Sequence, residues 1–475
     1  MTQTINPVKN SSAETNTTGF YTLPGTGGAA ALSNPSDGGA PNAGTDYARF
    51  TWSTASTAAG GGCQLGHATN TGVERIDVVA GQQYQVGVWV RASKAKTLQL
   101  QALAYNTSGA QVGSTASGTA VAVTAATWTR ITVAITPGAG GVRLVLKVVD
   151  TDATRWSVGN TLDVDAVMAW PGATLPAYSD PSTNPLMGWQ GTAFQSPAIL
   201  FAPVITITTY TDPNPLPRAE VLVQDLPPGF VSVTRTADGR TMPVRGLIKA
   251  PSATGVTAID GEIPFGVNVT YQVQLLDPTG ASIGYVSAAP VVLDVQDTWV
   301  HQPLDIHLAA QVDLTDDSAQ SLPRSVDGET VYPDGATVGV WIGAPRRGLE
   351  GLDLTIEPPD LAAADMLQQM LGGYDRNQVA VLCIRTPPGY TRMPRTLFLT
   401  VPKSAENDVN IRYGGTLTQL ALTGDEVRPP APGLLTALLR YADTDAFFGS
   451  YAAIDAYYGS YLARDRDYSK AGFAG

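Results

Sequence analysis

Cysteine and histidine are scarce in this chain. Its 475 residues include two cysteines, Cys63 and Cys383, which are far apart and form no disulfide framework. The three histidines are His67, His301 and His307, few for an enzyme of this length. Cys63 and His67 are four residues apart, but a zinc site needs about four ligands and no companion pair exists. The sequence therefore gives no support to a zinc site.

Long apolar runs and excess positive charge are also missing. No run of 18 apolar residues occurs, so we expect no membrane span. The first residues, MTQTINPVKNSSAETNTTG, contain no apolar signal core, so we expect synthesis in a reducing cytoplasm without a signal peptide. The net charge is −12, and no basic patch suggests a nucleic-acid partner. Residues 1–200 hold ten basic and ten acidic residues, and this neutral half suits either an uncharged ligand or simple solubility.

Recognisable catalytic motifs are absent as well. GTGG at 25–28 is not followed by a helical pattern, and there is no nucleophile elbow, His-Glu-x-x-His or kinase motif set. A glycosidase needs only two carboxylates across a cleft, and sequence does not reveal such a pair. We predict that the chain is not an enzyme and requires no cofactor. A glycan-degrading enzyme is the alternative.

Glycine and proline are abundant instead, with 49 and 34 residues, as expected of short strands joined by turns. Several segments between residues 20 and 176 alternate apolar and polar residues, which places one face in a core. We predict a mainly β protein with an N-terminal jelly roll or β-sandwich at 1–176 and a linker at 177–200. A second β-sandwich at 201–299, a mixed domain at 300–430 and a repeat tail at 431–475 complete the predicted organisation.

The same alternation selects candidate ligand-binding residues on the outward faces of the first domain. Sugars stack on aromatic rings, while amides and charged groups bind their hydroxyls. The candidates are Trp89, Arg91, Gln99, Gln101, Tyr105, Arg143 and Lys147. We interpret them as one carbohydrate-binding face. The alternative is that Trp89 is covered by a loop or packed on another domain.

The segment PPDLAAADMLQQMLGGY predicts a helix in the mixed domain. Asp360 can accept hydrogen bonds from the free N–H groups of its first turn. The next segment, QVAVLCIRT at 378–386, predicts a buried strand that contains Cys383. Earlier in the chain, Arg235, Arg240 and Arg245 lie near Asp238, Asp260 and Glu262 in sequence, which suggests a partly buried charge network.

The C-terminal tail repeats every ten residues, with Tyr441, Tyr451 and Tyr461 at equivalent positions and Gly-Ser at the junctions. Gly-Ser predicts breaks between three short helical segments, with glycine ending one segment and serine capping the next. We predict that Tyr441, Tyr451, Tyr458 and Tyr461 are assembly contacts. The alternative is that these aromatics fold back on their own domain.

Residues 84–170 resemble jelly-roll carbohydrate-binding modules of the galactose-binding-like type. Trp89-Val90-Arg91 and Trp128-Thr129-Arg130 match two of their strands, and Asp165 matches the first of a paired aspartate in the last strand. Ala166 replaces the second aspartate. Many such modules hold a structural calcium ion there, so the resemblance implies a possible calcium site at Asp165.

From residue 201 onward the chain resembles minor tail proteins of siphophages that infect actinobacteria. The motifs are Asp238-Gly239-Arg240, Val244-Arg245-Gly246, Pro264-Phe265-Gly266 and Trp299 with Pro303-Leu304-Asp305, together with the C-terminal repeat. Gly261 stands where the family often has an aromatic residue. The resemblance implies a virion protein at the tail tip that contacts other tail proteins, forms a homo-oligomer and displays its first domain to a host cell-envelope glycan.

Overall fold

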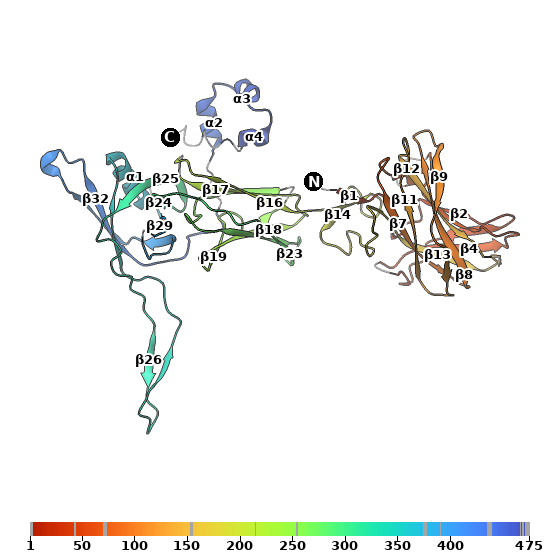
Figure 1. Cartoon of the computed structure of the whole chain (residues 1–475), viewed down its shortest axis with the longest axis horizontal. Coiled ribbons are helices and arrows are strands. Elements are labelled where there is room, and N and C mark those ends of the chain that lie inside the picture. The colour runs from red at the N-terminus through yellow and green to blue at the C-terminus, as the bar shows by residue number, and fades with distance from the viewer. Residues whose placement is uncertain are drawn as a thin grey trace. The chain divides into compact units, whose positions relative to one another are not determined.

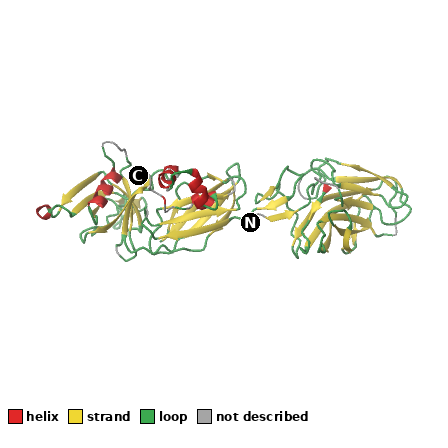
Figure 2. Ribbon diagram, turned by 90° about the horizontal axis from the view of Figure 1, so that it is seen from above, coloured by secondary structure: helices red, strands yellow, loops and turns green. Residues whose placement is uncertain are grey.

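The structure is a computed structural model. It describes residues 3–41, 44–69, 74–152, 155–213, 215–252, 255–373, 378–389, 391–434, 439–465, 467 and 470. The chain divides into two compact units, Met1–Ala202 and Pro203–Gly475. Strands dominate both units, which confirms the mainly β prediction (Figures 1 and 2). The finer division of the second unit into separate domains stays a prediction.

Two antiparallel sheets form the sandwich of the first unit. The β7 sheet has the strand order β11 (Thr129–Ile135), β7 (Tyr84–Ala92), β13 (Thr161–Pro171), β4 (Ala48–Thr54) and β3 (Ala29–Ser33). The β8 sheet has the order β10 (Val121–Val123), β8 (Lys96–Tyr105), β12 (Arg143–Asp150), β5 (Gly62–Leu65) and β2 (Phe20–Leu23). Two further strands, β6 (Ile76–Asp77) and β9 (Gln111–Ser117), pair with β12 and β8.

The sandwich core consists of the apolar residues that the alternation predicted. Val86, Val88 and Val90 of β7 and Leu98 and Leu100 of β8 are all fully buried. Each of these side chains stabilises the folded state by about 1.5–3 kcal/mol relative to an exposed position. The polar residues between them face outward, so the core fixes which side chains of each strand are available for a ligand.

A three-stranded sheet joins the start of the chain to the segment predicted as a linker. It has the order β1 (Gln3–Asn6), β15 (Ala198–Leu200) and β14 (Met187–Trp189). The Trp189 and Phe194 rings lie 5.1 Å apart between centroids. Trp189 also packs against Met187 and Ala198. Trp170 of the sandwich belongs to the same cluster, so these aromatic residues tether the segment to the first unit.

The second unit contains three larger sheets and a hairpin. The first sheet is β16 (Val204–Tyr210), β17 (Arg218–Gln224) and β21 (Gly255–Asp260), and the second is β19 (Arg240–Pro243), β18 (Phe230–Ala237), β22 (Thr270–Leu276) and β23 (Ser282–Ser287), with β20 (Ala250–Pro251) on β18. The third is β30 (Thr396–Thr400), β29 (Val381–Arg385), β24 (Thr298–Gln302), β25 (Asp305–Leu314), β28 (Leu352–Glu357), β32 (Thr418–Gly424) and β31 (Lys403–Asp408). The hairpin β26 (Gly328–Val331) and β27 (Val340–Gly343) reaches away from these sheets (Figure 1).

Helix α1 (Leu361–Leu371) forms where the sequence predicts it. Asp360 is its N-cap, and its Oδ1 accepts a hydrogen bond from the Ala363 N–H at 2.8 Å. Leu367 and Met370 are buried, whereas Leu361 is 49% exposed. The strand that follows, β29, is buried throughout and includes Cys383, as predicted. None of the helices in the described part of the chain is long and apolar enough to cross a bilayer.

The tail forms three short helices, α2 (Tyr441–Phe447), α3 (Tyr451–Tyr457) and α4 (Tyr461–Asp465). Ser450 Oγ accepts a hydrogen bond from the Ala453 N–H, and Ser460 Oγ accepts one from the Ala463 N–H. The predicted breaks and serine caps are therefore confirmed. The prediction that glycine ends the segments is wrong, because α2 and α3 end at Phe448 and Tyr458, both in extended conformation.

Four residues of the predicted charge network do meet in the core of the second unit. Arg235 lies 2.8 Å from Asp260 and 3.2 Å from Glu262, and Arg245 lies 2.7 Å from Glu262. The Tyr271 hydroxyl donates to Asp260 at 2.8 Å. The two arginines and two acids compensate each other, as a buried network requires.

The prediction is wrong for Arg240 and Asp238, which lie outside this network. Arg240 instead pairs with Glu426 at 2.7 Å. Asp238 is exposed in the turn between β18 and β19, with φ of 49°, and Gly239 follows with φ of 72°. Two successive positive φ angles are typical of a tight hairpin turn, and Asp-Gly is a favoured pair there. The Asp-Gly motif therefore shapes a turn.

Candidate functional site

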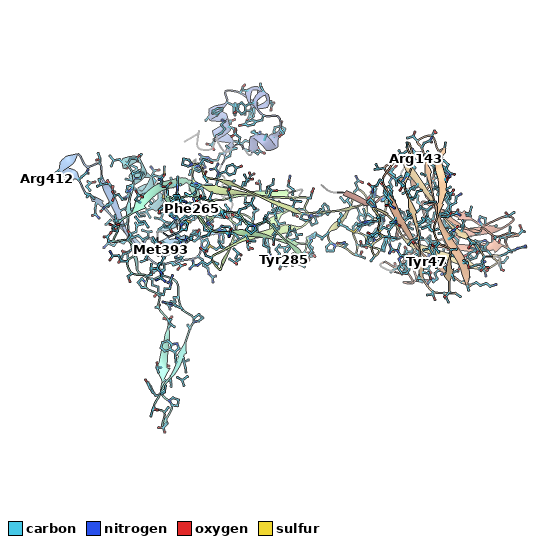
Figure 3. All side chains as sticks on the ribbon, viewed as in Figure 1. Tyr47, Arg143, Phe265, Tyr285, Met393 and Arg412 are labelled. Atoms are coloured by element: carbon cyan, nitrogen blue, oxygen red, sulfur yellow. The ribbon has the colours of Figure 1, made fainter. Side chains whose placement is uncertain are left out.

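The structure distributes the seven candidate ligand-binding residues over two sheets. Gln99, Gln101 and Tyr105 of β8 and Arg143 and Lys147 of β12 share the outer face of the β8 sheet. Trp89 and Arg91 lie on the outer face of the β7 sheet, so the single face predicted from sequence is divided. Figure 3 labels Arg143, on β12 of the β8 sheet, and Tyr47, whose ring lies 5.0 Å from the Arg91 guanidinium.

On the β8 sheet, five directly paired residues form one row across five neighbouring strands. The row runs through Tyr21, Gln64, Lys147, Gln101 and Ser117. Neighbouring strands lie about 4.8 Å apart, so the row spans about 19 Å. We call these five residues the β8 row. All but Ser117 are half-buried.

Hydrogen bonds orient the amides in and beside the β8 row. Gln101 Nε2 donates to Gln99 Oε1 at 3.3 Å, and Gln99 Nε2 donates to the Gly118 carbonyl at 2.9 Å. Gln64 Nε2 donates to the Gly66 carbonyl at 3.2 Å. Lys147 has no hydrogen-bond or ion-pair partner among the described residues. Its ammonium group and the remaining amide positions are available to a ligand.

Sequence reasoning missed Tyr21, Gln64 and Ser117. Tyr21 and Gln64 lie on four-residue strands, FYTL and GCQL, which are too short to reveal a clear alternation. Ser117 ends a strand rich in small polar residues, QVGSTAS. Only strand pairing places Gln64 beside Lys147, Ser117 beside Gln101, and Tyr21 beside Gln64.

Arg143 and Tyr105 are paired with each other and lie beyond the β8 row. Arg143 Nη1 donates to the carbonyl of Ala68 at 2.8 Å, so this arginine holds the loop that follows β5. Leu103 and Val145, between this pair and the row, are only 6% and 2% exposed. Arg143 is therefore a support for the edge of the face.

Arg91 is committed to partners within the β7 sheet. Its Nε donates to Asp163 Oδ2 at 2.9 Å, and Asp163 also binds Arg49 at 2.7 Å. The Arg91 guanidinium lies 5.0 Å from the Tyr47 ring and 4.7 Å from the Trp128 ring, in cation–π geometry. This arrangement gives Arg91 a structural role between strands.

Trp89 is half-buried, and its indole Nε1 is buried without a hydrogen-bond partner among the described residues. It is paired with Arg130 on one side and with Asp165 on the other. Burial lowers the pKa of Arg130. Trp89 therefore does not share a face with Gln99 and Gln101, and the alternative that a loop or another domain covers its ring stays a prediction.

Asp165 is fully buried, and neither carboxyl oxygen has a hydrogen-bond partner among the described residues. Burial raises its pKa to about 8, and the negative charges of Glu14 and Asp180 add to the shift. Asn10 Oδ1 and Ser12 Oγ are also buried without partners. Both belong to a segment whose Ser11 carbonyl accepts a hydrogen bond from Val167 N–H of the same strand as Asp165.

These oxygen atoms fit calcium, which prefers carboxylate, amide and hydroxyl oxygens. Among the described residues, no group of three or more histidine, cysteine, aspartate or glutamate side chains is placed to hold a metal ion. A calcium ion beside Asp165 would therefore depend on neutral oxygens such as those of Asn10 and Ser12. Ala166, which follows with φ of 50°, lies in a bulge of β13 that turns the strand at this point.

The tail tyrosines fall into two classes. Tyr441, Tyr451 and Tyr461 are 75%, 72% and 71% exposed. Tyr458 is half-buried, and its hydroxyl donates to Asp467 at 2.8 Å. The Tyr458 ring also packs against other aromatics of the tail. Tyr458 thus stabilises the tail itself. Tyr441 and Tyr461 lie in cation–π contact with Arg464, and these two rings and that of Tyr451 remain mostly exposed to a partner.

No protein-family model matches this chain, and no curated protein does. Solved structures share a likeness to about a third of it. One holds the CBM22-1 and GH10 modules of Clostridium thermocellum endo-1,4-beta-D-xylanase 10B with xylohexaose, with 15% identity, 36% of this chain and 29% of that chain covered, and a TM-score of 0.26. Another is the CBM22-1 xylan-binding domain of Paenibacillus barcinonensis Xyn10C, with 16% identity and a TM-score of 0.23. The likeness covers 33% of this chain and 94% of that chain.

A third structure is the enzymatically active domain of Bacteriophage CBA120 tailspike protein 4, with 15% identity, 35% and 22% of the two chains covered, and a TM-score of 0.27. This chain spans less than a third of the length of the xylanase and tailspike chains. Because all three scores are below 0.5, no ligand or activity of this chain follows from them.

Proposed function

We propose that this chain is a structural component of a phage tail tip, a minor tail protein, whose first unit binds a glycan of the host cell surface. The observation that carries the binding proposal is the β8 row, in which a tyrosine, two glutamines, a lysine and a serine align across one sheet face. Binding without catalysis is part of the proposal.

The chemistry of the β8 row suits a sugar chain. Tyr21 offers a ring for C–H stacking, and Gln64 and Gln101 can donate to and accept from hydroxyls. Lys147 adds three donors without a competing partner in the described part of the chain. Because the face is open and mostly uncharged, each site binds weakly. Several copies on one particle raise the overall affinity through effective concentration.

The tail-tip role is supported by the motifs shared with siphophage minor tail proteins. The three exposed tail tyrosines supply apolar surface for neighbouring tail proteins or for another copy of the chain. We expect the protein in the virion, and immunoblotting of purified particles tests this placement directly.

The experiment for the glycan proposal measures binding of the full chain to a glycan array and to purified host cell wall. We expect binding that weakens at least about tenfold in Gln101→Ala/Lys147→Ala, because hydrogen bonds to a charged group and an amide are lost. Gln85→Ala, on the β7 sheet, is the matched control and should bind normally. Release of soluble sugars from the cell wall would instead favour the glycan-degrading alternative.

We also propose that a calcium ion occupies the oxygen-lined position beside Asp165 when the protein is calcium-loaded. Bound calcium would stabilise the first unit because it compensates a buried carboxylate. Calcium should raise the Tm of the wild-type chain in a calcium-free buffer, and Asp165→Asn should remove that increase. An equal increase in Tm on calcium addition in wild type and Asp165→Asn would contradict a calcium site at Asp165.

A further inference from the structure

The second unit contains an arginine-rich cavity that the proposed glycan face does not involve. It has a volume of about 380 Å³ and lies beside the β18–β19 turn. Its walls come from β18, β19, residues 391–396 and Arg324. Figure 3 labels Met393, one of the wall residues. We call this the arginine cavity.

Five arginines line the arginine cavity together with a single acid, Asp238. Two of these arginines have compensated charges. Arg235 pairs with buried acids of the charge network, and Arg240 pairs with Glu426. The remaining three are Arg324, Arg392 and Arg395.

The remaining arginines have charges that no acid of the described chain neutralises. Arg324 and Arg392 form no ion pair or hydrogen bond with any described residue. Arg395 donates to the Pro387 carbonyl at 2.6 Å, which leaves its positive charge in place. Arg392 is exposed and Arg324 is half-buried, so both guanidinium groups are accessible to a ligand.

A second hollow of about 890 Å³ adjoins the arginine cavity, because Arg324, Thr391, Arg392 and Arg395 line both. Arg346 also lines this hollow, and no acidic side chain does. Four arginines therefore converge on one place in a part of the chain, residues 201–475, that carries the whole net charge of −12. The neighbouring Arg347, by contrast, pairs with Asp327 and Glu350.

The arginines favour a negatively charged ligand, and the other wall residues indicate which further groups such a ligand would carry. Met242, Pro264, Met393 and Pro394 supply an apolar wall. Ser318, Gln320 and Thr391 supply hydroxyl and amide groups. A concave site of several hundred Å³ with an apolar wall and a few polar groups is typical of small-molecule binding. Arginine binds carboxylate or phosphate through two parallel hydrogen bonds.

We propose that the arginine cavity binds a hydroxylated anion, a sugar unit that carries a phosphate or carboxylate group. The oxyanion would lie between Arg324 and Arg392, with the sugar ring against the methionines. An acidic peptide of a partner protein fits less well, because standard protein interfaces bury about 800 Å² per partner rather than filling a hollow of this size. The inference concerns the second unit and does not depend on the glycan proposal for the first.

The test is isothermal titration calorimetry of the full chain at low ionic strength. The probes are glucose 6-phosphate, trigalacturonate, inorganic phosphate, hexaglutamate and uncharged maltotriose. We expect at least one charged sugar to bind more tightly than inorganic phosphate and hexaglutamate, and its affinity to fall as NaCl increases. Binding of glucose 6-phosphate would identify phosphate as the anionic group of the ligand, and binding of trigalacturonate would identify carboxylate.

Arg324→Glu/Arg392→Glu should weaken that binding at least about tenfold, because charge-assisted hydrogen bonds are lost and repulsion replaces them. Neither arginine is ion-paired, so the variant should unfold at the wild-type Tm. Arg412→Glu is the matched control, because Arg412 is exposed and lies apart from Met393 in Figure 3.

Several results would overturn the proposal. The first is that neither charged sugar binds. The second is that inorganic phosphate binds as tightly as the charged sugar, or hexaglutamate more tightly. The third is that Arg324→Glu/Arg392→Glu binds the charged sugar as tightly as wild type does. Loss of charged-sugar binding in Gln101→Ala/Lys147→Ala would move the ligand to the β8 row and also overturn it. Failure of this test leaves the glycan proposal intact, because maltotriose and neutral glycans probe the β8 row separately.

Discussion

In the second unit, the buried environment of His301 controls the protonation of its side chain. It is fully buried opposite Cys383, and neither ring nitrogen has a hydrogen-bond partner among the described residues. Burial, together with the positive charges of Arg385, Arg245 and Arg235, lowers its pKa well below the usual 6.5. His301 therefore stays neutral in the folded protein just below pH 6.5, where a histidine of the unfolded chain already binds a proton.

This difference predicts an acid-sensitive stability for the second unit. As pH falls below about 6.5, the unfolded state gains a proton that the folded state does not, so the free energy of unfolding decreases. The contribution of one such proton is at most about 1.4 kcal/mol per pH unit. Urea denaturation at pH 7, 6 and 5 measures this effect. The free energy of unfolding should fall less steeply with decreasing pH in His301→Gln than in wild type. His67→Gln, in the first unit, should keep the wild-type slope, and equal slopes for all three proteins would contradict this account.

At the scale of elements, alternation predicted the faces of strands but not their partners. Val86 and Leu98 face the core as expected, and Gln99 and Lys147 face outward. However, β7 and β8 are consecutive in sequence and still belong to opposite sheets. Sheet membership depends on long-range pairing, which a single sequence does not show. For that reason Trp89 was assigned to the same face as Gln101.

Local sequence signals are sufficient to predict an element whose ends are fixed by hydrogen bonds between neighbouring residues. The α1 helix and the breaks in the tail follow from short-range hydrogen bonds at Asp360, Ser450 and Ser460, which the sequence displays. The β8 row, by contrast, requires the register of five strands at once. The helices are therefore predictable from the sequence, whereas three of the five residues of the β8 row are not.

The N-cap of α1 gives a quantitative prediction. Asp360→Ala removes the acceptor for the Ala363 N–H, so we expect the second unit to lose about 1 kcal/mol of stability. Asp360→Ser restores an acceptor and should recover most of the loss. Chemical denaturation of the three proteins measures the effect. A similar loss in the serine and alanine variants would show that the cap hydrogen bond is not the cause.

The tail gives a prediction about assembly. Replacing Tyr441, Tyr451 and Tyr461 by serine removes three exposed rings. Tyr441 and Tyr461 also lie in cation–π contact with Arg464, so circular dichroism must show that the variant keeps its fold. We expect reduced incorporation into particles, and deletion of 436–475 should abolish it. Immunoblotting of purified particles measures both. Tyr285→Ser, at an exposed tyrosine on β23, is the control. Normal incorporation of the deletion variant would refute a docking role for the tail.

At the scale of the whole molecule, charge and chemistry are divided between the two units. Residues 1–200 are neutral overall and contain the β8 row, whereas the rest carries the net negative charge and the arginine cavity. This division fits a protein in which one part meets a mostly uncharged glycan and the other is held by neighbouring subunits. Under the proposed function a single copy need not bind tightly, because several copies on one particle would raise the overall affinity.

The central claim is that the outer face of the β8 sheet binds a host surface glycan. The most direct measurement compares the full chain and Gln101→Ala/Lys147→Ala for binding to purified host cell wall, with Gln85→Ala as control. The account predicts binding by wild type and Gln85→Ala and at least about tenfold weaker binding by the double variant. Equal binding by all three proteins, or no binding by wild type, would contradict it.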